Sequence, residues 1–198
     1  MREPDAGRRR GRRLDPVALL AVGLFVLLAA AAWPALQHRL AALPGNAAIA
    51  AIETGRPLTE AGLTRALESR RAALAALEDG RAKREVGMVH LRRARDPAIV
   101  STVRWADVPA ASTALRSALA RAPADHFAWY HLAMAEALGV RAASAARALE
   151  TAYAFGPYHP PIRAARTRLG LALWAELAPE ARETVLAELA GTRSGRRR

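Results

Sequence analysis

Residues 125–157 read DHFAWYHLAMAEALGVRAASAARALETAYAFGP, two helical patterns joined by a short turn that contains a glycine. Asp125 suits the N-cap of a helix over residues 126–138, and Gly139 suits its end. A second helix is expected over residues 141–155. Alanine and leucine dominate both segments, and neither alternates apolar and polar residues over the length of a strand. The stretch therefore predicts a helical hairpin.

Part of this hairpin repeats an earlier segment of the chain after a shift of 34 residues. The matching residues are Ala114, Leu115, Ala118, Ala120 and Pro123, which recur as Ala148, Leu149, Ala152, Ala154 and Pro157. The tetratricopeptide repeat (TPR) has the same period, and the chain resembles that family. The residues that carry the resemblance are Trp129, Leu132, Ala145, Leu149, Ala152 and Pro157. It implies TPR-like helical hairpins stacked into a right-handed α-solenoid.

The resemblance covers about residues 81–190 and is uneven along that length. Ala133 stands where the family usually has glycine. On the N-terminal side, Val86-Gly87 would belong to a first helix paired with the Pro109 helix across a long connector. On the C-terminal side, Leu169-Gly170 fits only if residues 158–160 are an insertion. A generic alanine-rich bundle without true repeats remains the alternative.

Most of the rest of the chain also has helical patterns. Further helices are expected over residues 47–54, 59–79, 81–95, 109–122, 161–177 and 179–190. Thr59 is the expected N-cap of the second of these, with Gly80 at its end, and Gly191 is expected to stop the last. Prolines are expected in the first turns of three helices, where a missing N–H has no cost. The predicted fold class is all-α.

The helix over residues 59–79 carries one narrow apolar stripe. Its members are Leu63, Leu67, Leu74 and Leu77, with Arg70 and Arg71 between them. Arginines elsewhere on its surface are expected to be solvated.

Residues 17–36 read VALLAVGLFVLLAAAAWPAL and carry no charge. At about 1.5 Å per residue, a helix of this length spans roughly 30 Å, the thickness of a bilayer's hydrocarbon core. Trp33 near its end suits the headgroup interface. Six arginines precede the run, whereas only Arg39 follows it closely. The positive-inside rule therefore predicts a cytoplasmic N-terminus and export of everything after about residue 40.

A cleaved signal peptide is the competing interpretation of this segment. Its apolar core would be residues 17–29, and Ala30-Ala31-Ala32 would offer a cleavage site before Trp33. The apolar character continues past that site, which favours an uncleaved anchor. A twin-arginine signal is disfavoured because Asp15-Pro16 interrupts the apolar continuation after Arg12-Arg13.

Composition narrows the choice of function. The chain has 198 residues and no cysteine, which excludes disulfides and thiolate chemistry. Its net charge is +12, of which residues 1–13 and the tail after residue 191 each hold +4, so the body is close to balanced. This distribution argues against a nucleic-acid groove. All basic residues except Lys83 are arginine, and with the abundant alanine they suggest the GC-rich genome of a bacterium.

The expected organisation has five parts. Residues 1–13 form a basic cytoplasmic tail, 14–42 the transmembrane anchor, 43–80 a helical linker region, 81–191 the TPR-like domain and 192–198 a basic disordered tail.

No catalytic or metal-binding motif is present. His126 and His131 are five residues apart, so they do not share a helix face as a metal-binding pair would. Glu180, Glu183 and Glu188 are expected on a solvated face. No cofactor, metal, small-molecule substrate or enzymatic activity is therefore expected.

The resemblance also implies a concave groove lined by the first helix of each hairpin. At the family's spacing, the partner-binding residues here are Phe127, Tyr130 and Met134. The alternative is that these three side chains only pack against the preceding helices. The family's carboxylate-binding version carries Lys, Arg and Asn along this helix, and they are absent, so binding of a C-terminal carboxylate is not expected.

These observations predict a single-pass bacterial inner-membrane protein with a periplasmic domain. It would act as a non-enzymatic scaffold or adaptor that binds protein partners in an envelope-biogenesis complex. Residues 158–189 resemble the tails of small proteins associated with exopolysaccharide production, which extends the expectation to polysaccharide synthesis or export. The alternative is a secreted, soluble periplasmic TPR-like binding module released by signal cleavage.

Overall fold

The computed structural model describes residues 16–97, 99, 101–157 and 160–195. Their helices are α1 (Pro16–Ala42), α2 (Asn46–Glu53), α3 (Glu60–Ala76), α4 (Gly80–Ala94), α5 (Ser101–Leu119), α6 (His126–Leu138), α7 (Ala142–Phe155), α8 (Pro160–Ala172) and α9 (Pro179–Gly195), with 3₁₀ turns η1 (Leu43–Gly45) and η2 (Trp174–Glu176). No described residue lies in a strand, which confirms the all-helical prediction. The predicted basic tail 1–13, residues 158–159 of the insertion and the final arginines 196–198 lie outside the described residues.

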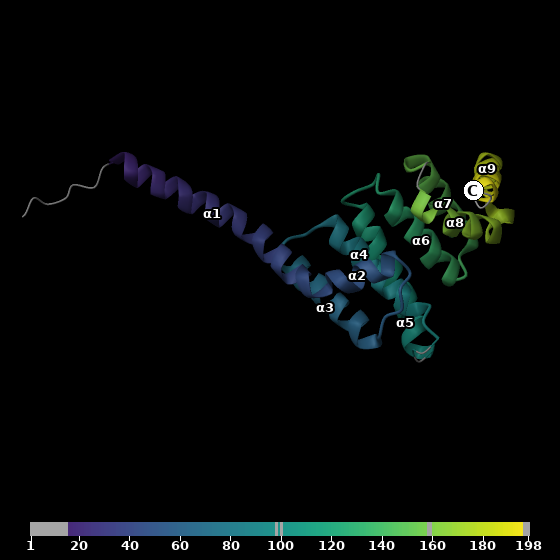
Figure 1. Cartoon of the computed structure of the whole chain (residues 1–198), viewed down its shortest axis with the longest axis horizontal. Helices are drawn as coiled ribbons and strands as arrows, with labels where there is room; N and C mark the ends of the chain where they lie inside the picture. The colour runs from purple at the N-terminus through teal and green to yellow at the C-terminus, as the bar shows by residue number, and fades with distance from the viewer. Residues whose placement is uncertain (1–15, 98, 100, 158–159, 196–198) are drawn as a thin grey trace, which may run out of the picture.

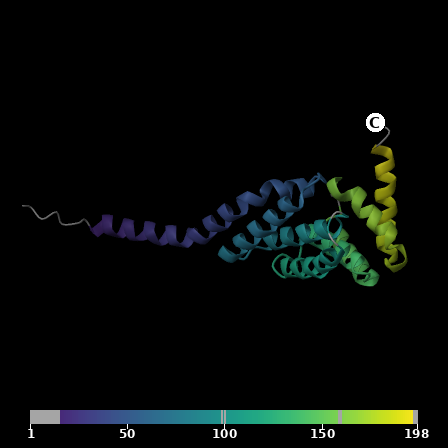
Figure 2. The same cartoon turned by 90° about the horizontal axis from the view of Figure 1, so that it is seen from below.

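The α1 helix extends away from the body as a stalk (Figures 1 and 2). Its residues 17–33 are all exposed, and the described chain has one helix, at this end, that is long and apolar enough to cross a membrane. The end of α1 runs antiparallel to α3, where His38 Nδ1 lies 3.0 Å from the carbonyl oxygen of Ala73. Through η1 it continues into α2, so the stalk joins the body without a flexible linker.

Six helices of the body form three antiparallel pairs: α4 with α5, α6 with α7, and α8 with α9. In the outer two pairs a glycine lets the helices approach closely. A Cβ atom on Gly87 would lie 2.5 Å from Cγ of Leu115, and one on Gly170 would lie 2.5 Å from Cγ2 of Val185. In both outer pairs, close approach of the two helices therefore depends on a glycine facing a larger side chain.

Two apolar clusters fill the body. The N-terminal cluster joins α2, α3 and α4 around Leu63 and Val89, both fully buried. The larger one extends from α4 to α9 around Leu115, Leu149 and Val185, which are also fully buried. Leu115 and Leu149, which match at the 34-residue shift, thus occupy equivalent buried positions in successive pairs.

Buried ion pairs tie the helices together at each junction. Arg70 of α3 pairs with Glu85 of α4 and also donates to the carbonyl oxygen of Ala42 at 2.6 Å and to Oδ1 of Asn46 at 2.8 Å. Arg166 of α8 pairs with Glu188 of α9. These contacts fasten the stalk to the body and the last pair to itself.

The junction between α5, α6 and α7 depends on Glu136. This side chain pairs with Arg141 and accepts from Arg116 at 2.8 Å. Burial raises the pKa of Glu136, but the hydrogen bond from Arg141 and the charges of both arginines outweigh that effect, so its pKa lies below the ordinary value.

Several local predictions are confirmed. Thr59 caps α3 by accepting from the N–H of Gly62 at 3.2 Å. Asp125 caps α6 by accepting from the N–H groups of Phe127 and Ala128 at 3.0 and 3.1 Å. Both caps satisfy N–H groups that the first turn of a helix leaves without partners.

Other local predictions are wrong at helix ends. Pro109 lies inside α5, which begins eight residues earlier at Ser101, rather than in a first turn. Gly80 starts α4 instead of stopping α3, because Asp79 caps the new helix through the N–H of Ala82. Gly191 does not stop α9, which continues to Gly195 and so includes the first residues of the predicted disordered tail.

Three side chains differ in environment from the sequence prediction. Leu77, placed on the apolar stripe of α3, is exposed, whereas Arg70, which interrupts that stripe, is only 2% exposed and ion-paired. Glu188 does not belong to a solvated face, since it lies between Arg166 and the hydroxyl groups of Tyr153 and Thr167.

Candidate functional site

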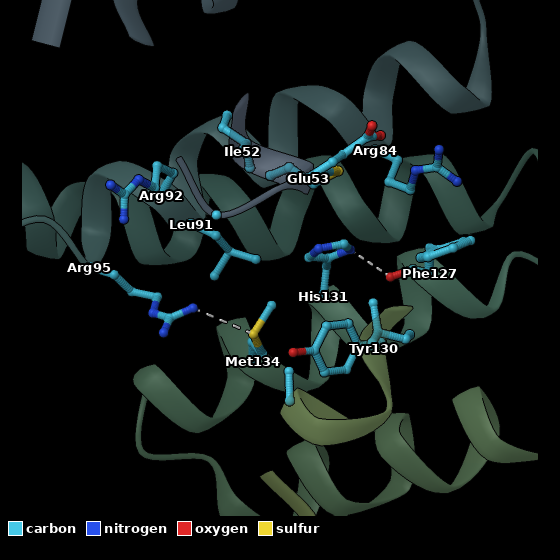
Figure 3. Close-up of a pocket in the computed structure, with 14 residues that line it drawn as sticks. Ile52, Glu53, Arg84, Leu91, Arg92, Arg95, Phe127, Tyr130, His131 and Met134 are labelled. Carbon is cyan, nitrogen blue, oxygen red and sulfur yellow. Dashed lines mark hydrogen bonds between the residues drawn. The ribbon is translucent and has the colours of Figure 1, made fainter. Parts of the chain in front are cut away.

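A pocket of about 600 Å³ opens between α2, α4, α6 and α8 (Figure 3). The last three of these helices are the first members of the three antiparallel pairs. The lining residues are Ile52, Glu53, Gly55, Arg84, Met88, Leu91, Arg92, Arg95, Phe127, Tyr130, His131, Met134, Ile162 and Ala165. Its volume falls in the range of pockets that bind small molecules or a few side chains.

One wall of the pocket is a single face of α4. Arg84, Met88, Leu91, Arg92 and Arg95 recur at three- and four-residue intervals, so they lie above one another along the helix. This face combines two apolar side chains with three cationic ones. The opposite face of α4 holds Val86 and Val89, which are buried in the N-terminal cluster.

The structure brings the three predicted partner-binding residues together on the opposing wall, along α6. Tyr130 is buried, and Phe127 and Met134 are half-buried. The guanidinium of Arg84 lies 5.5 Å from the centre of the Phe127 ring, and Nη1 of Arg95 lies 3.9 Å from Sδ of Met134 (Figure 3). These residues therefore face α4 across the pocket and also contact its arginines.

His131 sits between Tyr130 and Phe127 on the same wall and is neutral at pH 7. Its pKa is lowered to about 4, mainly by burial and to a smaller extent by the charges of Arg84 and Arg95, while the backbone hydrogen bond to Phe127 and the charge of Asp125 oppose the shift. Its Nδ1 lies 2.7 Å from the carbonyl oxygen of Phe127. Since a carbonyl oxygen only accepts, Nδ1 carries the proton and Nε2 is an acceptor.

The electrostatic environment of the pocket is positive. Burial raises the pKa of Tyr130, and the charges that act on its hydroxyl are those of three arginines, Arg95, Arg168 and Arg166. Arg84 is neutralised by Asp125, at 2.6 Å. Within the described residues, neither Arg92 nor Arg95 lies within ion-pair distance of a carboxylate, and Nε of Arg92 is buried without a hydrogen-bond partner.

The pocket contains one carboxylate, Glu53, and one neutral imidazole, His131, with no serine or cysteine nucleophile among its lining residues. The described residues also hold no cluster of three His, Asp or Glu side chains with metal-binding geometry. The arrangement can bind apolar and anionic groups, which is the chemistry of recognition.

Sequence patterns did not identify the α4 wall. They place Ala82, Val86 and Val89 on one face of that helix and give the other face no role. The signal was present, because Arg84, Met88 and Arg92 follow one another at intervals of four residues. The contributions of Ile52 and Glu53 depend on how α2 folds back onto α4, which no local pattern encodes.

No protein-family model, curated protein or solved structure matches this chain. Its class therefore follows from its own features: an all-helical protein with one helix long and apolar enough to span a membrane, a body of antiparallel helix pairs, and a pocket between them.

Proposed function

We propose that this chain is a membrane-anchored scaffold of TPR-like repeats that holds a protein partner in the pocket between α2, α4, α6 and α8. The observation that carries the proposal is the composition of that pocket. Its walls come from the first helix of each antiparallel pair, so a stack of hairpins builds one continuous surface there. Repeat proteins bind extended segments on such surfaces.

Three features of the body support a repeat arrangement. The two outer pairs each have a small residue of the first helix against a large one of the second, at Gly87–Leu115 and Gly170–Val185. Leu115 and Leu149 are separated by 34 residues and are both fully buried. The pairs are consecutive along the chain, so each can bury an apolar face against the next.

We propose α1 as the membrane anchor. Its residues 17–33 are exposed along the whole length of the stalk, which in water would leave an apolar surface without cover. A bilayer covers that surface, and the six arginines before residue 14 favour a cytoplasmic N-terminus. The body then lies on the outer side of a bacterial inner membrane, where it would serve an envelope-biogenesis complex, including one for polysaccharide synthesis or export.

Crosslinking in cells tests the binding function directly. A photoreactive amino acid is placed at Met134 in the pocket and, as a control, at Arg147, which is exposed on α7 and does not line the pocket. We expect a defined protein adduct from position 134 and none from position 147. Equal labelling from both positions, or none from position 134, would contradict a scaffold that acts through this pocket.

Topology is tested with the full chain in membranes. We expect carbonate to leave the protein in the membrane fraction, at full size, and a C-terminal alkaline phosphatase fusion to be active outside the cytoplasm. Release into the soluble fraction with loss of residues 1–32 would instead support the secreted module. A fusion active only in the cytoplasm would contradict both locations.

A further inference from the structure

The arginines of the pocket divide into one that is neutralised within the fold and two that are not. Arg84 is held by Asp125, the N-cap residue of α6, at 2.6 Å. Arg92 and Arg95 lie one helical turn apart further along the same face of α4, and in the described residues no carboxylate lies within ion-pair distance of either. Arg92 is half-buried, so its guanidinium without a counter-charge is costly unless a ligand supplies one, whereas Arg95 is exposed and its charge is solvated.

The rest of the lining determines what else the ligand must carry. Met88 and Leu91 on α4, Phe127 and Met134 on α6, and Ile162 on α8 give the pocket an apolar interior. Figure 3 shows Arg95 reaching from α4 across to Met134, so positive charge and apolar surface meet at that point. A ligand that fits has an apolar side chain for the interior and an anionic group beside it.

The chain's own segments do not satisfy this requirement. Residues 1–13 and 192–198 are rich in arginine, so they would bring like charge to Arg92 and Arg95. A second copy is disfavoured because its body also carries a net positive charge, +4 of the chain's +12. The occupant that complements the pocket is therefore a different protein with carboxylate side chains.

We propose, on the basis of the binding function above, that the pocket selects an extended protein segment in which acidic side chains flank an apolar one, with Arg92 and Arg95 as the residues that determine this specificity. The apolar side chain enters between Phe127, Met134 and Ile162, and the flanking carboxylates accept hydrogen bonds from the two guanidinium groups. Charge-assisted hydrogen bonds of this kind are the stronger class of hydrogen bond.

Three synthetic peptides that differ only in charge test the proposal. Each has the same central leucine and glycine spacers, with flanking residues that are all Glu, all Gln or all Lys, and a fluorescent label. Binding to the full chain in non-ionic detergent is followed by fluorescence anisotropy. We expect the Glu peptide to bind about tenfold more tightly than the Gln peptide, with a preference that declines as salt is raised, and the Lys peptide most weakly.

The variant R92Q/R95Q connects that preference to the two arginines. It should lower the affinity for the Glu peptide about tenfold and leave the affinity for the Gln peptide unchanged. R65Q/R71Q, which removes two exposed arginines of α3 and the same net charge, is the matched control and should change neither affinity. If R65Q/R71Q weakens the Glu peptide as much as R92Q/R95Q does, the effect is general attraction and the proposal is wrong.

A third variant separates failure of this inference from failure of the proposed function. Phe127→Ala should weaken the Glu and Gln peptides alike, because both place leucine in the pocket. The Glu and Gln peptides could bind equally well and both lose binding in Phe127→Ala. That result would overturn the acidic specificity but support the binding pocket. If Phe127→Ala leaves the binding of the peptides unchanged, both the acidic specificity and the binding pocket are overturned. Binding of anionic phospholipid vesicles in place of the Glu peptide would assign the arginines to lipid and also reject the proposal.

Discussion

The two faces of α4 differ in how their charged side chains are partnered. On the face that packs into the body, Glu85 meets Arg70, and His90 and Arg93 meet Asp107 at 2.6 and 3.1 Å. On the pocket face, Arg84 is paired with Asp125, but Arg92 and Arg95 have no carboxylate within ion-pair distance among the described residues. The number of arginines alone therefore does not indicate function in this chain. The ion-pair partner of each arginine distinguishes those that hold helices together from those that are available to bind a ligand.

The largest effect on stability is expected from Glu85→Gln, which removes an ion pair on the packed face of α4. This change leaves Arg70, which is only 2% exposed, without its counter-charge. We expect a loss of about 3–5 kcal/mol in the free energy of unfolding, measured by urea denaturation. The double variant Arg70→Met/Glu85→Leu should recover most of that loss, because no buried charge remains. A Glu85→Gln protein as stable as the native one would show that the pair is not a structural tie.

The next effect concerns the close approach of α4 and α5 at Gly87. In Gly87→Ala the new Cβ meets Leu115, which is fully buried and cannot move aside. We expect a net loss of about 1–2 kcal/mol in the free energy of unfolding, since overpacking outweighs the better helix propensity of alanine.

Gly23→Ala is the matched control for Gly87→Ala, because a Cβ there has no neighbour within 4 Å. It should leave the unfolding transition of the body unchanged. Combining Gly87→Ala with Leu115→Ala should cost less than the sum of the two single changes, and simple additivity would show that these side chains do not clash.

An effect of similar size concerns the pH dependence of stability at His131. Its pKa of about 4 in the folded protein lies below its ordinary value of 6.5, so the unfolded chain binds the proton more readily. Stability from this residue is therefore complete above pH 6.5 and is lost as the pH falls toward 4. Between pH 7 and pH 5 we expect a loss of about 2 kcal/mol in the free energy of unfolding. His131→Gln should remove this part of the pH dependence, and an unchanged profile would contradict the buried neutral imidazole.

Local sequence patterns predicted the helices well and their junctions poorly. The α6–α7 hairpin follows from Asp125, Gly139 and the alanine-rich segments between them, because caps and helix propensities act over a few residues. Pro109 was misplaced because a proline inside a helix costs a hydrogen bond that packing of the surrounding helix can offset. The role of Arg70 depends on Glu85 of another helix, and no local rule pairs them.

The same limit applies to the pocket. Phe127, Tyr130 and Met134 were selected through the resemblance to the TPR family, and the structure places them on one wall. Arg92 and Arg95 could not be assigned to that site from sequence, because their role depends on how α4 lies against α6. The sequence showed that one face of α4 has regularly spaced side chains, but it did not show which part of the protein that face would contact.

The smallest effect on stability is expected from R92Q/R95Q, which changes the pocket face of α4. Because Arg92 and Arg95 have no carboxylate to lose within the described fold, R92Q/R95Q should change the free energy of unfolding by less than about 0.5 kcal/mol. The sign should favour the variant, since two like charges near Arg84 are removed. Urea denaturation beside Glu85→Gln provides the measurement. A loss of several kcal/mol in R92Q/R95Q would mean that these arginines hold the fold together as Arg70 does, and the two faces of α4 would no longer differ in kind.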